Sequence, residues 1–147
     1  MGSSDPAPSA LPTITLTAQY LKDFSFENLI PGRLARHEMK PMSIELRATV
    51  NVHELGNDLH ETELFLGLTG KIDGETAFIA ELTYGASHHI VRVDPQMAEV
   101  FLYVEAARNV FPYATAILSQ TAAGAGLPPV WLDPVDFMGL FNARRAG

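Results

Sequence analysis

The feature that most constrains the fold is an alternation of apolar and polar residues that recurs four times between residues 13 and 85. Such period-two alternation is typical of a β-strand with one buried face and one solvated face. The four alternating segments are residues 13–27, 42–53, 59–69 and 76–85. Gly56-Asn57-Asp58 and Asp73-Gly74 supply hairpin turns between the later segments. The sequence therefore predicts a four-stranded antiparallel sheet whose apolar face must be covered.

The first segment is the least regular of the four. Its expected apolar face consists of Ile14, Leu16, Ala18, Tyr20, Phe24 and Phe26. The expected polar face carries Thr13, Thr15, Thr17, Gln19, Asp23, Ser25 and Glu27. Leu21 and Lys22 interrupt the alternation, which indicates a bulge or a bend at that point.

The second half of the chain changes to a helical period. Asp94-Pro95 is a helix start, since Asp caps free N–H groups and Pro is favoured at the first helical position. The helix is expected to end at Gly124–Gly126, with either a new cap or a bend near Asn109. Asp133-Pro134 repeats the start signal ahead of a short final helix. Strands followed by helices predict an α+β fold: a four-stranded antiparallel sheet, a long and possibly broken helix, and a short C-terminal helix.

Composition excludes several classes of protein. The chain has 147 residues, which fits one domain, and no cysteine, which excludes disulfides and thiol chemistry. A formal net charge of −7 opposes binding to phosphate backbones, so we expect no nucleic-acid partner. The sequence has no apolar run of roughly 18 residues, so we expect no membrane insertion. The first ten residues have neither a basic nor an apolar region, so we expect no secretory signal there. We expect a disordered tail over residues 1–12 and a short tail over 144–147.

The candidate chemical groups do not form a catalytic pattern in the sequence. His88 and His89 are adjacent, so on a strand they point to opposite faces. His53 and His60 flank a hairpin turn, but no third metal ligand is evident. Nucleotide-binding glycine motifs and a nucleophile elbow are missing. We therefore expect no metal, no cofactor and no enzymatic activity.

Two groups of motifs carry a resemblance to a known family. FPYA at residues 111–114, G-x-x-P at 126–129, L-x-P-V-x-F at 132–137 and L-F at 140–141 follow one another near the C-terminus. KD-x-SFE at residues 22–27 lies near the N-terminus. This order resembles the SecB protein-export chaperones, over residues 13–143. The resemblance implies a cytoplasmic holdase that binds unfolded precursor proteins and delivers them to the motor protein SecA.

The resemblance also assigns two sets of binding residues. The positions that contact SecA in the family are occupied here by Asp23, Glu27, Ile79 and Glu81. The groove that holds unfolded clients is expected to include Met39, Phe111, Phe137, Leu140 and Phe141. From the residues alone, the first set is more simply a solvated sheet face, and the second set is more simply made of core or subunit-packing residues.

The resemblance further implies a homotetramer built as a dimer of dimers, with edge strands and the Met97–Thr121 helices making the contacts. Two other functions stay open at this level. One is a SecB-like chaperone dedicated to a toxin–antitoxin system. The other is a small α+β enzyme or ligand-binding domain with a pocket between sheet and helix.

Overall fold

The computed structural model describes residues 11–37 and 40–147. Four strands form one antiparallel sheet in the order β1-β4-β3-β2, which confirms the predicted sheet. They are β1 (Thr13–Asn28), β2 (Ser43–Gly56), β3 (Leu59–Ile72) and β4 (Glu75–Val91). Strand β4 runs beyond the predicted end at Gly85 because its last residues pair with both β1 and β3. Of the expected tail over residues 1–12, only residues 11 and 12 are among the described residues. Met39, which was expected in the client groove, lies outside the described residues.

The helices follow the sheet as predicted, with different boundaries. A short helix, α1 (Pro31–Ala35), precedes β2. The long helix is continuous through α2 (Pro95–Val100), a π-helical turn η2 (Phe101–Glu105) and α3 (Ala106–Gly124). The predicted cap at Asp94 is confirmed, since its carboxylate accepts the Gln96 N–H at 2.8 Å. The predicted break at Asn109 is wrong, because this residue lies within α3.

The last helix, α4 (Phe137–Ala146), starts later and ends later than the sequence indicates. The Asp133-Pro134 start is wrong: Asp136 is the cap and accepts the Gly139 N–H at 2.9 Å. Arg144 and the two residues after it, which were expected in a short tail, continue the helix. Arg144 and Arg145 lie in its last turn, where cations favour the negative end of the helix dipole.

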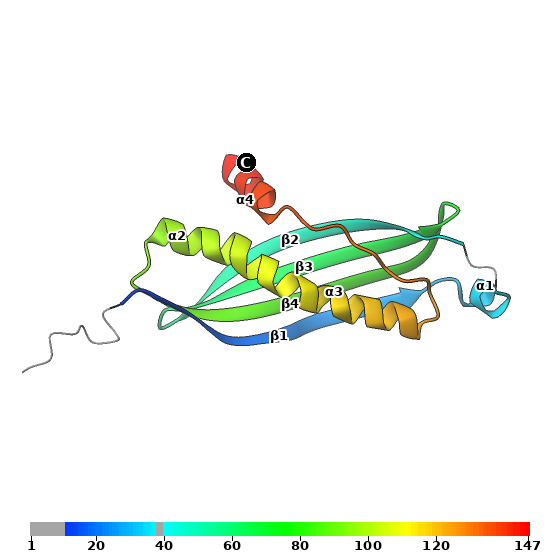
Figure 1. The fold of residues 1–147 in the computed structure, drawn as a ribbon, viewed down its shortest axis with the longest axis horizontal. Coiled ribbons are helices and arrows are strands. Elements are labelled where there is room, and N and C mark those ends of the chain that lie inside the picture. The colour runs from blue at the N-terminus through cyan, green and yellow to red at the C-terminus, as the bar shows by residue number, and fades with distance from the viewer. Residues whose placement is uncertain (1–10, 38–39) are drawn as a thin grey trace, which may run out of the picture.

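Figure 1 shows the long helix lying across one side of the sheet. We call this side the helix face and the other side the open face. On α3, the fully buried residues recur mostly every fourth position and are mostly small: Ala106, Ala107, Val110, Ala114, Leu118 and Ala122. This narrow stripe allows the helix backbone to lie close to Leu64, Leu66 and Leu82 of the central strands, which are almost fully buried.

The π-helical turn has a clear partner in the sheet. The Thr62 hydroxyl on β3 is completely buried and donates to the Leu102 carbonyl oxygen at 2.7 Å. A π turn widens the helix by one residue and disturbs its regular hydrogen bonds. The threonine therefore satisfies a carbonyl group at the irregular turn, where a buried unpaired acceptor is costly.

Strand β1 contains two bulges, which correct the predicted faces. The register with β4 shifts between Leu16 and Ala18 and again between Leu21 and Asp23. An extra residue reverses the side on which the following side chains lie. The bulge at Lys22 was predicted, but Ala18 and Tyr20 are on the open face rather than with Ile14. Between the bulges, Gln19 and Leu21 take the helix face.

Candidate binding surfaces

The four residues expected to contact SecA lie together on the open face. Glu27 of β1 pairs directly with Ile79 of β4, and Ser25 pairs with Glu81. Asp23 is two residues further along the same face. Ile79 is 42% exposed, and among the described residues none of these three carboxylates makes an ion pair. The result is an acidic surface around one exposed aliphatic side chain.

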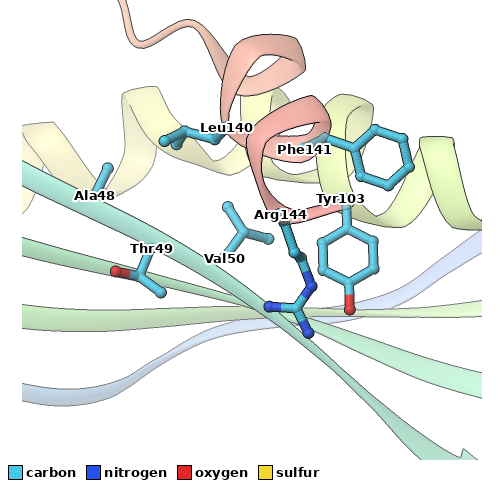
Figure 2. Close-up of a pocket in the computed structure, with 7 residues that line it drawn as sticks. All are labelled: Ala48, Thr49, Val50, Tyr103, Leu140, Phe141 and Arg144. Carbon is cyan, nitrogen blue, oxygen red and sulfur yellow. The ribbon is translucent and has the colours of Figure 1, made fainter. Parts of the chain in front are cut away.

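The helix face has an open pocket of about 120 Å³ between β2 and α4 (Figure 2). Its floor is β2, and Leu140, Phe141 and Arg144 reach it from α4. Tyr103 of the π turn closes one side. Most of the lining is apolar, which suits a side chain selected by hydrophobicity rather than by sequence. The full lining is Ala48, Thr49, Val50, Tyr103, Leu140, Phe141 and Arg144.

The predicted groove residues divide into two groups by burial. Leu140 is 38% exposed and lines the pocket. Phe137 is 2% exposed and packs edge-on against Phe111 with 5.8 Å between ring centroids. Phe141 is 4% exposed and packs against Tyr103 at 5.5 Å, so it contributes only its edge to the pocket. Phe111 and Phe137 therefore anchor α4 to the long helix.

Of the residues that line the pocket, sequence reasoning predicted only Leu140 and Phe141, and it missed the three β2 residues as well as Tyr103 and Arg144. Tyr103 lies in the π turn, which no sequence pattern indicated. Arg144 follows Leu140 by four residues and so shares its side of the helix, a spacing that was visible in the sequence. Its guanidinium lies 4.9 Å from the centre of the Tyr103 ring, in a cation–π contact. The pocket therefore combines an apolar floor with a cation at its rim.

A polar network crosses the open face beside the acidic surface. The Lys22 ammonium donates to Glu61 at 2.8 Å and to Glu63 at 2.7 Å. The Tyr20 hydroxyl donates to Glu61 at 2.6 Å. Since this hydroxyl has one proton, the Ser87 hydroxyl, 2.5 Å away, is the donor in their contact. We call these five residues the lysine clamp.

The ionisation of the lysine clamp follows from its contacts. Hydrogen bonds to Glu61 and Glu63 raise the pKa of Lys22 well above its usual range. Burial raises the pKa of Glu61, but the hydrogen bonds from Lys22 and Tyr20 outweigh it and leave that pKa below its ordinary value. Burial and the neighbouring Glu61 raise the pKa of Tyr20. The clamp is therefore a charged, fully hydrogen-bonded group at neutral pH.

The clamp also bears on the metal prediction. His53, Glu61 and Glu63 bring ligand atoms within 4.8 Å of one another, so the partners of His53 are these carboxylates rather than His60. The Lys22 ammonium already pairs with both carboxylates. A divalent cation at this place has to displace a strongly hydrogen-bonded lysine, which disfavours a metal site.

His88 is the other unusual ionisable group. It lies on the helix face of β4, is 6% exposed and packs edge-on against Phe101 at 4.9 Å. Its Nδ1 atom has no hydrogen-bond partner among the described residues. Burial lowers the pKa of His88 because the interior disfavours its charged form.

Apolar side chains remain exposed where β1 meets the start of the long helix. Ile14 is 41% exposed, Leu16 51% and Met97 67%. Two hollows of about 510 and 420 Å³ share Ile14, Val93 and Met97 in their walls. A contiguous apolar surface of this kind is typical of a protein–protein contact. Strand β1 is also an edge of the sheet, so its outer backbone groups are unpaired within the sheet.

These surfaces define a binding protein: an acidic sheet face, an apolar pocket and an exposed apolar edge. The chain belongs to the SecB family, since the family model described as preprotein translocase subunit SecB matches residues 7–147. None of the described helices is long and apolar enough to cross a membrane.

Relatives with high coverage support the same family. The protein-export protein SecB of Bartonella quintana is 36% identical over 135 residues, which covers 92% of this chain and 85% of the relative. The protein of the same name from Xanthobacter autotrophicus is 36% identical over 140 residues, covering 95% and 89%. A SecB-like chaperone of Mycobacterium tuberculosis, solved with an antitoxin peptide, has a TM-score of 0.68 at 11% identity. It covers 84% of this chain and 91% of that chain, and shows the same fold.

Proposed function

We propose that this chain is a cytoplasmic holdase that keeps precursor proteins unfolded and passes them to the SecA motor for export. Membership of the SecB family supports this role, since its relatives are protein-export proteins. The family favours a chaperone over a small α+β enzyme or ligand-binding domain. Holding a client needs no cofactor and no chemical step, because the binding energy comes from apolar burial.

The observation that carries the proposal is the open apolar pocket between β2 and α4 (Figure 2). Strand β2 is an edge of the sheet, so its outer N–H and C=O groups are unpaired within the sheet. An extended client can bond these groups while its side chains enter the apolar surface, a mode of binding that depends little on sequence. Leu140 and Arg144 then contact the client, while Phe137 keeps α4 in place.

Suppression of aggregation tests the holdase activity. A reduced, unfolding client is mixed with increasing amounts of the protein without nucleotide, and light scattering is followed. We expect scattering to fall to the baseline near a stoichiometric ratio. Unchanged scattering at every ratio contradicts the proposal. The single tryptophan, Trp131, is 84% exposed in the segment before α4, so its fluorescence offers a second measure of client binding.

We propose that the acidic surface of the open face contacts SecA. Asp23, Glu27 and Glu81 have no ion-pair partner among the described residues and surround the exposed Ile79. Such a surface attracts a basic partner, and the attraction weakens with salt. Glu27→Gln and Glu81→Gln are expected to lower SecA affinity and leave client binding unchanged. Normal SecA affinity of both variants at low salt contradicts this contact.

We propose a homotetramer, arranged as a dimer of dimers. The exposed apolar surface of Ile14, Leu16 and Met97 supports an association through β1 and the long helix. Light scattering in dilute solution is expected to give about four times the chain mass of 16.0 kDa. A monodisperse 16.0 kDa particle contradicts this assembly.

A role in a toxin–antitoxin system is the second candidate. The structural neighbour from Mycobacterium tuberculosis was solved with an antitoxin peptide, which shows what that protein binds. Competition distinguishes the two roles: a general holdase binds many unfolded clients with similar affinity, whereas a dedicated chaperone binds one antitoxin segment far more tightly.

A further inference from the structure

We propose that Lys22 is a positioning residue for the acidic surface: through the lysine clamp it holds the bulge of β1 in place and so fixes the position of Asp23 and Glu27 on the open face. This inference rests on the proposed SecA contact and adds a residue that does not itself touch the partner. Its basis is the path that the Lys22 side chain takes across the sheet.

The side chain of Lys22 crosses a whole strand to reach its partners. Lys22 is on β1, whereas Glu61 and Glu63 are on β3, and β4 lies between these two strands. The crossing passes over Gly85 of β4. A Cβ atom at Gly85 would lie 2.6 Å from the Tyr20 ring and 3.2 Å from the Lys22 side chain. Gly85 therefore provides the space for both side chains.

The lysine clamp contacts β1 on the open face, where none of the described helices packs against the strand. Glu61 is 7% exposed and accepts from both Tyr20 and Lys22, the residues that precede and occupy the second bulge. Backbone pairing is interrupted at a bulge, so a side-chain contact determines its position more than it does in a regular strand. Asp23 is the next residue along the chain.

The bulge decides which residues the open face displays. Without the extra residue at Lys22, the following residues exchange faces. Asp23 and Glu27 then point toward the helices, and Phe24 and Phe26 point to solvent. Phe26 stacks on the buried Phe78 at 5.1 Å, so core packing fixes the face, and the clamp fixes the position of the carboxylates on it.

The charge of Lys22 makes the proposal easy to separate from simple electrostatics. If only charge matters, Lys22→Met makes the open face more acidic and strengthens binding to a basic partner. If Lys22 positions the carboxylates, the same change weakens binding. Lys71→Met is the matched control: Lys71 pairs with Glu45 at 3.1 Å on the same face, and its loss changes the charge equally without touching β1.

The test measures the affinity of the tetrameric protein for SecA at low salt in parallel with its affinity for an unfolded client. We expect Lys22→Met to weaken SecA binding by about three- to tenfold, Lys71→Met to leave it equal or tighter, and client affinity to stay the same. Lys22→Arg, which keeps the charge, should restore most of the SecA affinity. Gly85→Ala displaces Tyr20 and Lys22 without a change of charge and should act like Lys22→Met.

Each outcome decides the question. If Lys22→Met and Lys71→Met strengthen SecA binding to the same degree, the role of Lys22 is electrostatic and the inference is overturned. If Lys22→Met weakens SecA and client binding equally, the clamp is only structural, which also overturns it. If the unmodified protein does not bind SecA, the proposed contact fails first. Hydrogen exchange at the amides of residues 20–24 provides a direct check, since loss of the clamp should increase it while α3 stays protected.

Discussion

The two faces of the sheet come from alternate residues of the same four strands, but they are packed very differently. On the helix face, Leu64, Leu66 and Phe78 are at most 1% exposed and lie under packed helices. On the open face, long polar side chains lie across the strands, as Lys22 does over Gly85. A packed interior resists small changes of volume, whereas flexible polar side chains can move aside. We therefore expect substitutions on the helix face to affect mainly the stability of the fold, and substitutions on the open face to affect mainly the binding of partners.

The largest expected effect is on the helix face, at the anchor of α4. Phe137→Ala removes a ring that is 2% exposed and packs on Phe111. We expect a loss of about 3–5 kcal/mol in the free energy of unfolding, because a cavity remains in the core. Denaturant unfolding at fixed protein concentration measures this. A loss below about 1 kcal/mol would contradict an anchoring role, since solvent-exposed positions usually stay in that range.

Gly70 and Gly67 lie on opposite faces of β3, so substitutions at the two positions test how tightly each face is packed. A Cβ atom at Gly70 would lie 2.2 Å from the buried Phe78 ring, whereas one at Gly67 would meet the end of the flexible Arg47 side chain at 3.0 Å. We expect Gly70→Ala to destabilise the protein by about 1–3 kcal/mol through overpacking. Gly67→Ala should stay within about 0.5 kcal/mol of the unmodified protein.

Thermal unfolding of both glycine variants under the same conditions makes the comparison. Equal losses of stability at the two positions would show that the open face is packed as rigidly as the helix face. This result would remove the distinction between the faces.

The pH dependence of stability should also separate the faces. The pKa of the buried His88 is lowered, so the unfolded chain binds its proton more readily than the folded protein. The stabilisation is complete above pH 6.5 and declines as the pH falls below that value. The pKa of Glu61 on the open face is also lowered, so its contribution is lost only below about pH 4.5.

Melting temperatures between pH 7.5 and pH 5 test the contribution of His88, with His88→Leu as the comparison. We expect the unmodified protein to lose stability over this range and the variant to lose less. An unchanged pH slope in His88→Leu would assign the effect to other histidines.

The smallest expected effect on stability is on the acidic surface. Glu27→Gln and Glu81→Gln remove exposed charges that make no ion pair among the described residues. We expect each change to alter the free energy of unfolding by less than about 0.5 kcal/mol. Denaturant unfolding measures these changes, with the Phe137→Ala variant in the same series for comparison. A loss above about 1 kcal/mol in the free energy of unfolding would identify these carboxylates as structural.

Much of the fold could be predicted because its regular parts have a regular period. The alternation in residues 42–53 and the Asp94 cap led directly to β2 and to the start of α2. The face of Tyr20 was predicted wrongly because one extra residue in a strand leaves no local signal until a second bulge restores the pattern. The break at Asn109 was wrong for a related reason: the irregularity of the long helix lies at η2, where it contacts a threonine of a distant strand, and no local pattern indicates it.

The candidate sites show the same limit. The neighbourhood of Glu27, Ile79 and Glu81 could be expected from motifs on two strands, and the strand register brings these residues together. The pocket was only half predicted, because Phe137 is used for packing and Tyr103 enters from a turn with no sequence pattern. The lysine clamp was missed entirely, since it depends on which strand lies between β1 and β3.

The π-helical turn has a consequence for how the long helix can be used. One additional residue in a turn rotates everything before it by about 100° relative to everything after it. The buried side chains of α3 thus face the sheet, while the exposed Met97 near the start of the helix lies beside Ile14. The long helix thereby presents two differently oriented surfaces, one packed against the sheet of its own chain and one exposed surface that we propose for contact with another chain. The boundary between the two surfaces is the π-helical turn, where the Thr62 hydroxyl bonds the Leu102 carbonyl oxygen.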